Sequence, residues 1–74
     1  MQNHPFTVIG KYRVRGHAAK RQDGLWLGSA TLLWEDGEAT NTRTDHFDRP
    51  CNTEEEAVQH AVQQVYIRVR DGVY

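Results

Sequence analysis

The most apolar run in the chain occupies residues 25–34, with the sequence Leu-Trp-Leu-Gly-Ser-Ala-Thr-Leu-Leu-Trp. One Asp-Gly pair stands before it at Asp23 and Gly24, and another follows it at Asp36 and Gly37. Asp-Gly between apolar segments is a strong signal for a β-hairpin turn, because such turns need a positive φ that glycine adopts without strain. The pattern therefore predicts that residues 25–34 form the middle strand of an antiparallel meander.

The segments on either side of this run have weaker patterns that fit flanking strands. Between residues 6 and 19, apolar residues alternate with basic and polar ones, which predicts a half-buried first strand. Gly10 and Gly16 interrupt that strand and indicate a bulge or a close approach of another segment. Residues 38–47 are mostly polar and rich in threonine, whose branched Cβ suits a third strand. Residues 1–5 are polar, and we expect them to form a loose terminus.

A helix is predicted after the third strand. Thr53 and Glu56 have the spacing of a capping box, and the glutamates at residues 54–56 complement the positive end of a helix dipole. An apolar stripe with helical spacing follows, and Gly72 is a natural stop. The stripe comprises Val58, Ala61, Val62, Val65 and Val69. Together these elements predict an α+β fold, a three-stranded antiparallel meander with one C-terminal α-helix packed on one face.

Length and composition limit the remaining choices. With 74 residues, the chain forms a single small domain, residues 1–74, whose core is marginal without support from a partner. Its one cysteine, Cys51, excludes an internal disulfide and fits a reducing compartment. No apolar run reaches the length of a membrane span, and no signal-peptide core is present. We therefore expect a soluble cytoplasmic protein, and its start at Met1 indicates that it is complete.

The lengths of the two turns decide which side chains share a sheet face. A turn with an even number of residues keeps the pairing parity and one with an odd number reverses it, and we take the even case for both turns. The helix then covers the face that carries Phe6, Val8, Tyr12, Val14, Leu25, Leu27, Leu33 and the threonines. The opposite face is left open, and it carries Lys11, Arg13, Arg15, Arg21, Trp26, Ala30, Leu32, Trp34, Ala39, Asn41, Arg43 and Phe47.

This tryptophan face is the candidate binding surface. It would place Arg13 beside Trp34 and Arg21 beside Trp26, an arrangement that suits cation–π contacts. Three interpretations are open: arginine stems shield the indoles within one monomer, the face is buried in a homodimer, or it binds nucleic acid or another anionic partner. The predicted binding residues are Arg13, Arg21, Trp26, Leu32, Trp34, Arg43 and Phe47. We favour a non-catalytic protein-interaction module that self-associates or binds another protein.

The alternative, a nucleic-acid-binding module, follows from the distribution of charge. Five basic residues precede Asp23, the first acidic one, so the first strand is basic; they are Lys11, Arg13, Arg15, Lys20 and Arg21. The net charge of −1 and the three successive glutamates at residues 54–56 argue against nucleic acid as the main partner.

Catalytic and metal chemistry have little support in the sequence. His46 and Asp48, with Asp45 and Cys51 nearby, are ligand types for zinc, but structural zinc sites need four ligands from paired clusters. Cys51 with His46 or His60 lacks the third group and the oxyanion motif of a nucleophilic site. The glycines are scattered singly, so there is no glycine-rich phosphate loop. We therefore expect no enzymatic activity, no metal, no cofactor and no membrane contact.

Two short motifs support a resemblance to known proteins. Asp-Gly-Leu-Trp opens the middle strand at residues 23–26, and Phe47 precedes the helix start Thr-Glu-Glu-Glu-Ala at residues 53–57 and Ala61. In this order, the chain resembles small bacterial β-β-β-α proteins of unknown function and, more remotely, the sheet-and-helix domain of HicB-type antitoxins. The resemblance implies the fold and transfers no active-site residues. HicB-type antitoxins usually carry a separate DNA-binding segment after this unit, whereas the sequence here ends at Tyr74.

Overall fold

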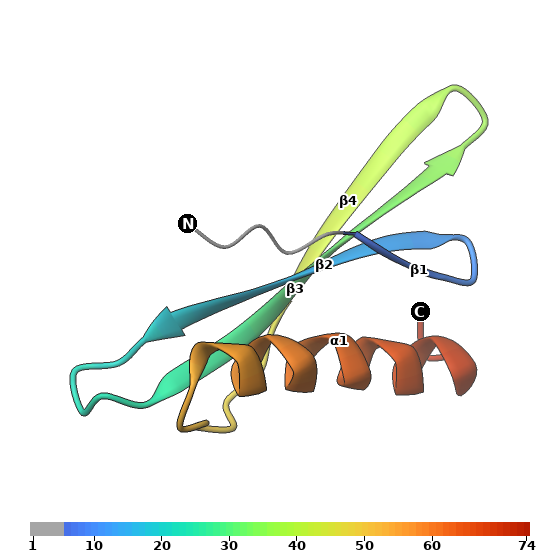
Figure 1. The fold of residues 1–74 in the computed structure, drawn as a ribbon. Helices are drawn as coiled ribbons and strands as arrows, with labels where there is room; N and C mark the ends of the chain where they lie inside the picture. The colour runs from blue at the N-terminus through green and yellow to red at the C-terminus, as the bar shows by residue number, and fades with distance from the viewer. Residues whose placement is uncertain (1–5) are drawn as a thin grey trace.

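The computed structural model describes residues 6–74 and consists of an antiparallel sheet with one helix packed against it (Figure 1). The elements are β1 (Thr7–Ile9), β2 (Tyr12–Lys20), β3 (Trp26–Asp36), β4 (Ala39–His46) and α1 (Glu54–Arg70). The sheet has four strands in the order β1-β2-β3-β4. The predicted α+β class with a C-terminal helix is confirmed, whereas the predicted count of three strands is one too low. The expectation of a loose terminus at residues 1–5 lies outside the described residues.

The extra strand arises because the predicted first strand folds back on itself. Ile9 pairs with Tyr12, so Gly10 and Lys11 form a two-residue turn between β1 and β2. Gly10 has a φ of 59°, which is costly for residues with a Cβ and free for glycine. The glycine that interrupted the sequence pattern therefore marks a hairpin turn.

The turn between β3 and β4 has the predicted parity. Asp36 pairs with Ala39, which leaves Gly37 and Glu38 as a two-residue turn. Gly37 has a φ of 64° at the first central position, as type II′ hairpin turns require. Even-numbered residues of β3 therefore share a face with odd-numbered residues of β4, as predicted.

The connection between β2 and β3 has the opposite parity from the prediction. Lys20 pairs with Trp26, so the loop consists of residues 21–25 and has an odd length. It is closed by a hydrogen bond of 2.6 Å from the Arg21 N–H to the Leu25 carbonyl oxygen and by Gly24, whose φ is 86°. The odd length places Val14 opposite Leu32, so even-numbered residues of both strands share a face.

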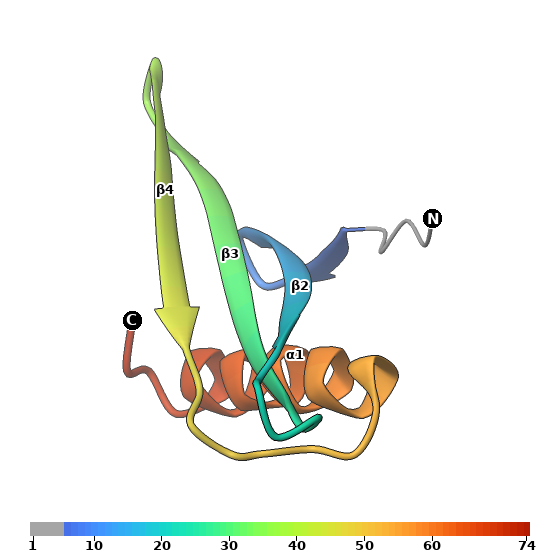
Figure 2. The same ribbon diagram turned by 90° about the vertical axis from the view of Figure 1, so that its left-hand side faces the viewer.

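The helix consequently covers the predicted side of β2, with Tyr12 and Val14, but the side of β3 and β4 that was predicted to be open. In Figure 2, α1 runs beneath β2 and β3 while the β3–β4 hairpin rises away from it. The core between the two layers consists of Ile9, Tyr12, Val14, Ala30, Leu32, Phe47, Ala61 and Val65. The predicted grouping of Val14 with Leu27 and Leu33 under the helix is therefore wrong.

Small residues let the helix approach the sheet closely. A Cβ added to Gly28 would lie 2.2 Å from the Ala57 carbonyl oxygen, and one added to Gly16 would lie 2.7 Å from a methyl carbon of Val58. Real Cβ atoms do not approach other atoms this closely. Ala57 and Ala61 on the helix are also fully buried at this contact. The predicted close approach at Gly16 is confirmed.

Both ends of α1 follow the predicted signals. The Thr53 hydroxyl accepts a hydrogen bond of 3.1 Å from the Glu56 N–H, which caps the first turn. At the other end, the Val73 N–H donates to the Arg68 carbonyl oxygen and the Gly72 N–H donates to that of Val69. With Gly72 at a φ of 73°, this is a Schellman motif.

The close contact at Gly28 predicts the effect of a single methyl group. Gly28→Ala should lower the free energy of unfolding by about 1–3 kcal/mol, because the new Cβ pushes the helix backbone away from the sheet. Gly16→Ala should cost less, since its nearest neighbours are side-chain methyl groups of Val58 and Val62. Urea denaturation followed by circular dichroism measures both changes.

Ser29→Ala is the matched control, because Ser29 is the next residue of β3 and its side chain lies on the face that α1 does not cover. Its effect should stay within about 0.5 kcal/mol of wild type. An unchanged or raised stability of Gly28→Ala would contradict the close helix–sheet contact.

Candidate functional site

The structure separates the seven predicted binding residues. Leu32 is fully buried and Phe47 nearly so, both in the core beneath α1. Trp34 is half-buried against the same core and meets Tyr12 edge-on at 5.4 Å between ring centroids. Trp26 is also half-buried, and the Lys20 ammonium rather than Arg21 lies 6.0 Å from its ring.

The three arginines of the prediction lie apart. Arg13 pairs with Leu33 and projects from the uncovered face, so it does not stand beside a tryptophan. Arg21 lies in the β2–β3 loop and forms an ion pair of 3.0 Å with Asp23. Arg43 lies on the helix side of β4, with its guanidinium carbon 4.9 Å from the centre of the Tyr74 ring. The predicted arrangement of tryptophans beside arginines is therefore wrong, because the odd-length β2–β3 loop reverses the faces of β3 and β4 relative to β2.

Three of the predicted residues do meet, beside the C-terminal residue. Leu32, Trp34 and Arg43 line a cavity of about 90 Å³ together with Tyr12 and Tyr74. Such a volume leaves room for a few water molecules at most. These residues therefore close one edge of the core, and the cavity between them is too small for a larger ligand.

Asp45 joins the C-terminus to β4 and α1. The Tyr74 hydroxyl donates a hydrogen bond to this carboxylate. Arg43 forms an ion pair of 2.9 Å with it, and Arg68 forms one of 3.4 Å from the helix. Sequence reasoning missed this cluster, because a terminal tyrosine and two arginines far apart in the chain carry no local pattern.

The cluster shifts the pKa of both acidic groups. Burial raises the pKa of Asp45, but hydrogen bonds from Tyr74 and Arg43 and the charges of Arg43 and Arg68 outweigh it, so that the pKa lies below its ordinary value. Burial and the hydrogen bond to Asp45 raise the pKa of Tyr74. Asp45 is therefore charged and Tyr74 neutral at neutral pH, which suits a structural clasp.

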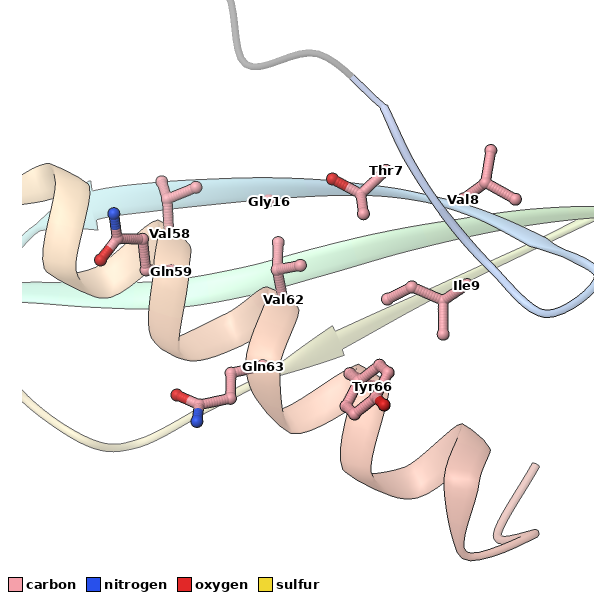
Figure 3. A pocket seen from close by; sticks show the side chains of 9 residues that line it. All are labelled: Thr7, Val8, Ile9, Gly16, Val58, Gln59, Val62, Gln63 and Tyr66. Carbon is pink, nitrogen blue, oxygen red and sulfur yellow. The ribbon is translucent and has the colours of Figure 1, made fainter.

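A second feature is an apolar groove at the edge of the sheet, which we name the β1–α1 groove. It lies where the short strand β1 ends and α1 passes beneath β2, and it has a volume of about 540 Å³ (Figure 3). Val58 and Val62 point from α1 towards β2, and Gly16 leaves the floor open. Its lining residues are Thr7, Val8, Ile9, Gly16, Val58, Gln59, Val62, Gln63 and Tyr66.

The surface around this groove is unusually apolar. Tyr66 is 53% exposed at its rim. Val8 is 73% exposed and pairs with Arg13, so its side chain projects from the uncovered sheet face, and Phe6, which is 46% exposed, has its ring beside Arg15. Among the described residues that line the groove, none is charged. The remaining large apolar residue with comparable exposure in residues 6–74 is Val73, beyond the end of α1.

The residues considered for chemistry do not converge. Asp45 and His46 are neighbours on β4 and project from opposite faces, and Cys51 is buried with its thiol 3.6 Å from the Arg49 carbonyl oxygen. Across residues 6–74, no group of three His, Cys, Asp or Glu side chains is placed to hold a metal ion. Burial and the charge of Arg49 lower the pKa of His60, which faces the Phe47 ring.

Comparisons with protein-family models, with curated proteins and with solved structures find no match to this chain. The resemblance to β-β-β-α proteins and HicB-type antitoxins therefore stays a prediction. Within the described part of the chain, no helix is long and apolar enough to cross a membrane.

The Asp45 cluster predicts how stability depends on pH. A carboxyl whose pKa is lower in the folded state stabilises the fold above its unfolded pKa, and this stabilisation is lost as the pH falls through the folded pKa. Asp45→Asn should therefore lower the free energy of unfolding at neutral pH by roughly 1–3 kcal/mol. It should also flatten the loss of stability in the acid range, measured by urea denaturation at several pH values.

Asp36→Asn is the control, because it removes an exposed carboxylate at the β3–β4 turn. It should keep the acid-range slope of wild type. An Asp45→Asn protein with the full wild-type slope would show that the clasp does not contribute to acid sensitivity.

Proposed function

We propose that this chain is a non-catalytic protein-interaction module that self-associates through the β1–α1 groove and the exposed residues around it. The observation that carries the proposal is the apolar groove, whose described lining residues are uncharged, with the half-exposed Tyr66 ring at its rim. The proposed interface thus lies at the β1 edge of the sheet, because α1 covers the tryptophan face.

Exposure of this surface has a cost that association removes. Soluble monomers rarely leave a large contiguous apolar patch in water unless the patch serves an interaction. Here Val58, Val62 and Tyr66 of α1 border an apolar hollow at the sheet edge, so a partner that fills the hollow can bury them together. An aromatic side chain such as Tyr66 is also a typical binding hot spot.

A second copy of the chain fits this surface better than a charged partner. In a two-fold interface the same residues face one another, so a charged patch would repel itself and a neutral one does not. The polar groups that line the groove include Gln59 and Gln63, and each amide carries both donors and an acceptor. Amides of this kind can pair with their own copies across a two-fold axis.

Strand β1 offers a backbone contact at the same place. It is one of the two edge strands of the described sheet, and its outer side carries backbone groups that a second β1 can pair with. Antiparallel pairing of two β1 edges would join two sheets and bring the two grooves together. A chain of 74 residues with a small core also gains stability from a partner.

Replacement of Tyr66 tests the proposal. Tyr66→Glu should raise the dissociation constant of the dimer by roughly tenfold or more, because a carboxylate would face its own copy in an apolar interface. Sedimentation equilibrium over a dilution series measures the constant. Circular dichroism checks that the variant is folded.

Val73→Glu is the matched control, since Val73 is also exposed and apolar but lies beyond the helix end, outside the groove lining. It should dimerise like wild type. The proposal fails if wild type stays monomeric at the highest concentrations reached, or if Val73→Glu disrupts association as much as Tyr66→Glu does.

A further inference from the structure

The sheet face that α1 does not cover carries an ordered array of hydrogen-bond donors. The strand registers place three cross-strand rows on β2, β3 and β4 in turn. The rows are Arg13–Leu33–Thr42, Arg15–Thr31–Thr44 and His17–Ser29–His46. We name these nine residues the open-face array. Eight of them carry a polar side chain that can donate a hydrogen bond, and Leu33 is the exception.

The array has a positive charge and contains no acid. Arg13 and Arg15 are its charged members, and the nearest acid on this face is Glu35 at the end of β3. Glu35 lies 3.9 Å from Arg13 in an exposed ion pair, which water and salt screen. The other acids lie elsewhere: Asp36 and Asp45 on the helix side of β3 and β4, residues 54–56 in the first turn of α1, and the rest in loops or turns.

Two hydroxyl groups of the array, those of Thr31 and Thr44, are held in place by partners within it. The Thr31 hydroxyl lies 3.1 Å from that of Thr44 and 3.3 Å from Nε2 of His17. The guanidinium of Arg15 lies 5.5 Å from the centre of the Phe6 ring, which supports it from the strand edge. Donors that are positioned in advance lose less entropy when they bind an anion.

We propose that the open-face array binds the phosphodiester backbone of a double-stranded nucleic acid. Arginine, threonine and serine are side chains that contact phosphate oxygens in such complexes. Neighbouring donors along one strand are about 6.8 Å apart, and neighbouring strands are about 4.8 Å apart, so the array spans several phosphates. Contacts of this kind carry no base information, so the binding is independent of sequence.

A duplex fits the array better than a single strand does. Proteins that bind single strands stack successive bases on several exposed aromatic rings. The nine residues of the array include no aromatic ring of Phe, Tyr or Trp, and the exposed Phe6 ring at its edge already lies against the Arg15 guanidinium. Both tryptophans lie on the helix side of β3. The inference also stands without the proposed dimer, because each copy carries a whole array.

The test uses the full chain and short labelled duplexes of DNA and of RNA with the same sequence, followed by fluorescence anisotropy over a range of salt concentrations. The Arg13→Gln/Arg15→Gln variant should bind roughly tenfold more weakly at low salt or worse. Its slope of log affinity against log salt should fall by about 2. The Arg13→Lys/Arg15→Lys variant should keep most of the binding, since it keeps both charges.

Arg49→Gln/Arg70→Gln is the matched control, because it removes two positive charges from the loop and the helix and leaves the array intact. It should bind like wild type, and circular dichroism should show the same fold for all variants. A comparison of the dissociation constants for the DNA and RNA duplexes shows which of the two nucleic acids the array prefers.

Four results would overturn the inference: no duplex binding at low salt, equal loss in the control variant, tighter binding to a single strand, or equally tight binding to poly-glutamate. The last result would assign the array to an acidic protein. Tyr66→Glu should leave the affinity of each copy for the duplex unchanged. The experiment can therefore contradict the duplex-binding inference without contradicting the proposed self-association, and the reverse.

Discussion

The close contact between α1 and the middle of the sheet decides the rest of this structure. Gly16 and Gly28 present backbone rather than side chains to the helix, and at Gly28 the helix presents the carbonyl group of Ala57 and the methyl group of Ala61. The two layers can therefore meet at this point only with small residues, while larger apolar side chains such as Leu32 and Val65 fill the core beside it. In a domain this small, one such contact fixes which sheet face is covered.

The choice of covered face also determines the two surfaces that remain for function. With α1 on the side of Gly16 and Gly28, the basic residues of β2 project into solvent, and the array around Arg13 and Arg15 forms on the far side of the sheet. The same placement leaves the β1 edge beside α1 incompletely filled, which produces the β1–α1 groove. One surface is apolar and uncharged and the other is polar and basic, so they suit different kinds of partner.

Local signals in the sequence were reliable, whereas the relation between β2 and β3 was not. Thr53 and Gly72 predicted the ends of the helix, and the Asp-Gly pairs predicted both turns that flank β3. Parity across the first turn depends on its length, and neither Asp23 nor Gly24 reveals whether the loop has four residues or five. Contacts between residues far apart in the chain, such as that of Tyr74 with Asp45, produce no local sequence pattern from which they could be predicted.

The most direct test of this account is a nuclear Overhauser spectrum of the protein in solution. Contacts should appear between the α protons of Gly28 and the methyl protons of Ala61, because these groups meet at the helix–sheet contact. Contacts from the α1 methyl groups to the side chains of Leu27 and Leu33, without those to Gly28, would place the helix on the opposite face. That result would contradict the account, since it would cover the open-face array and expose the tryptophans.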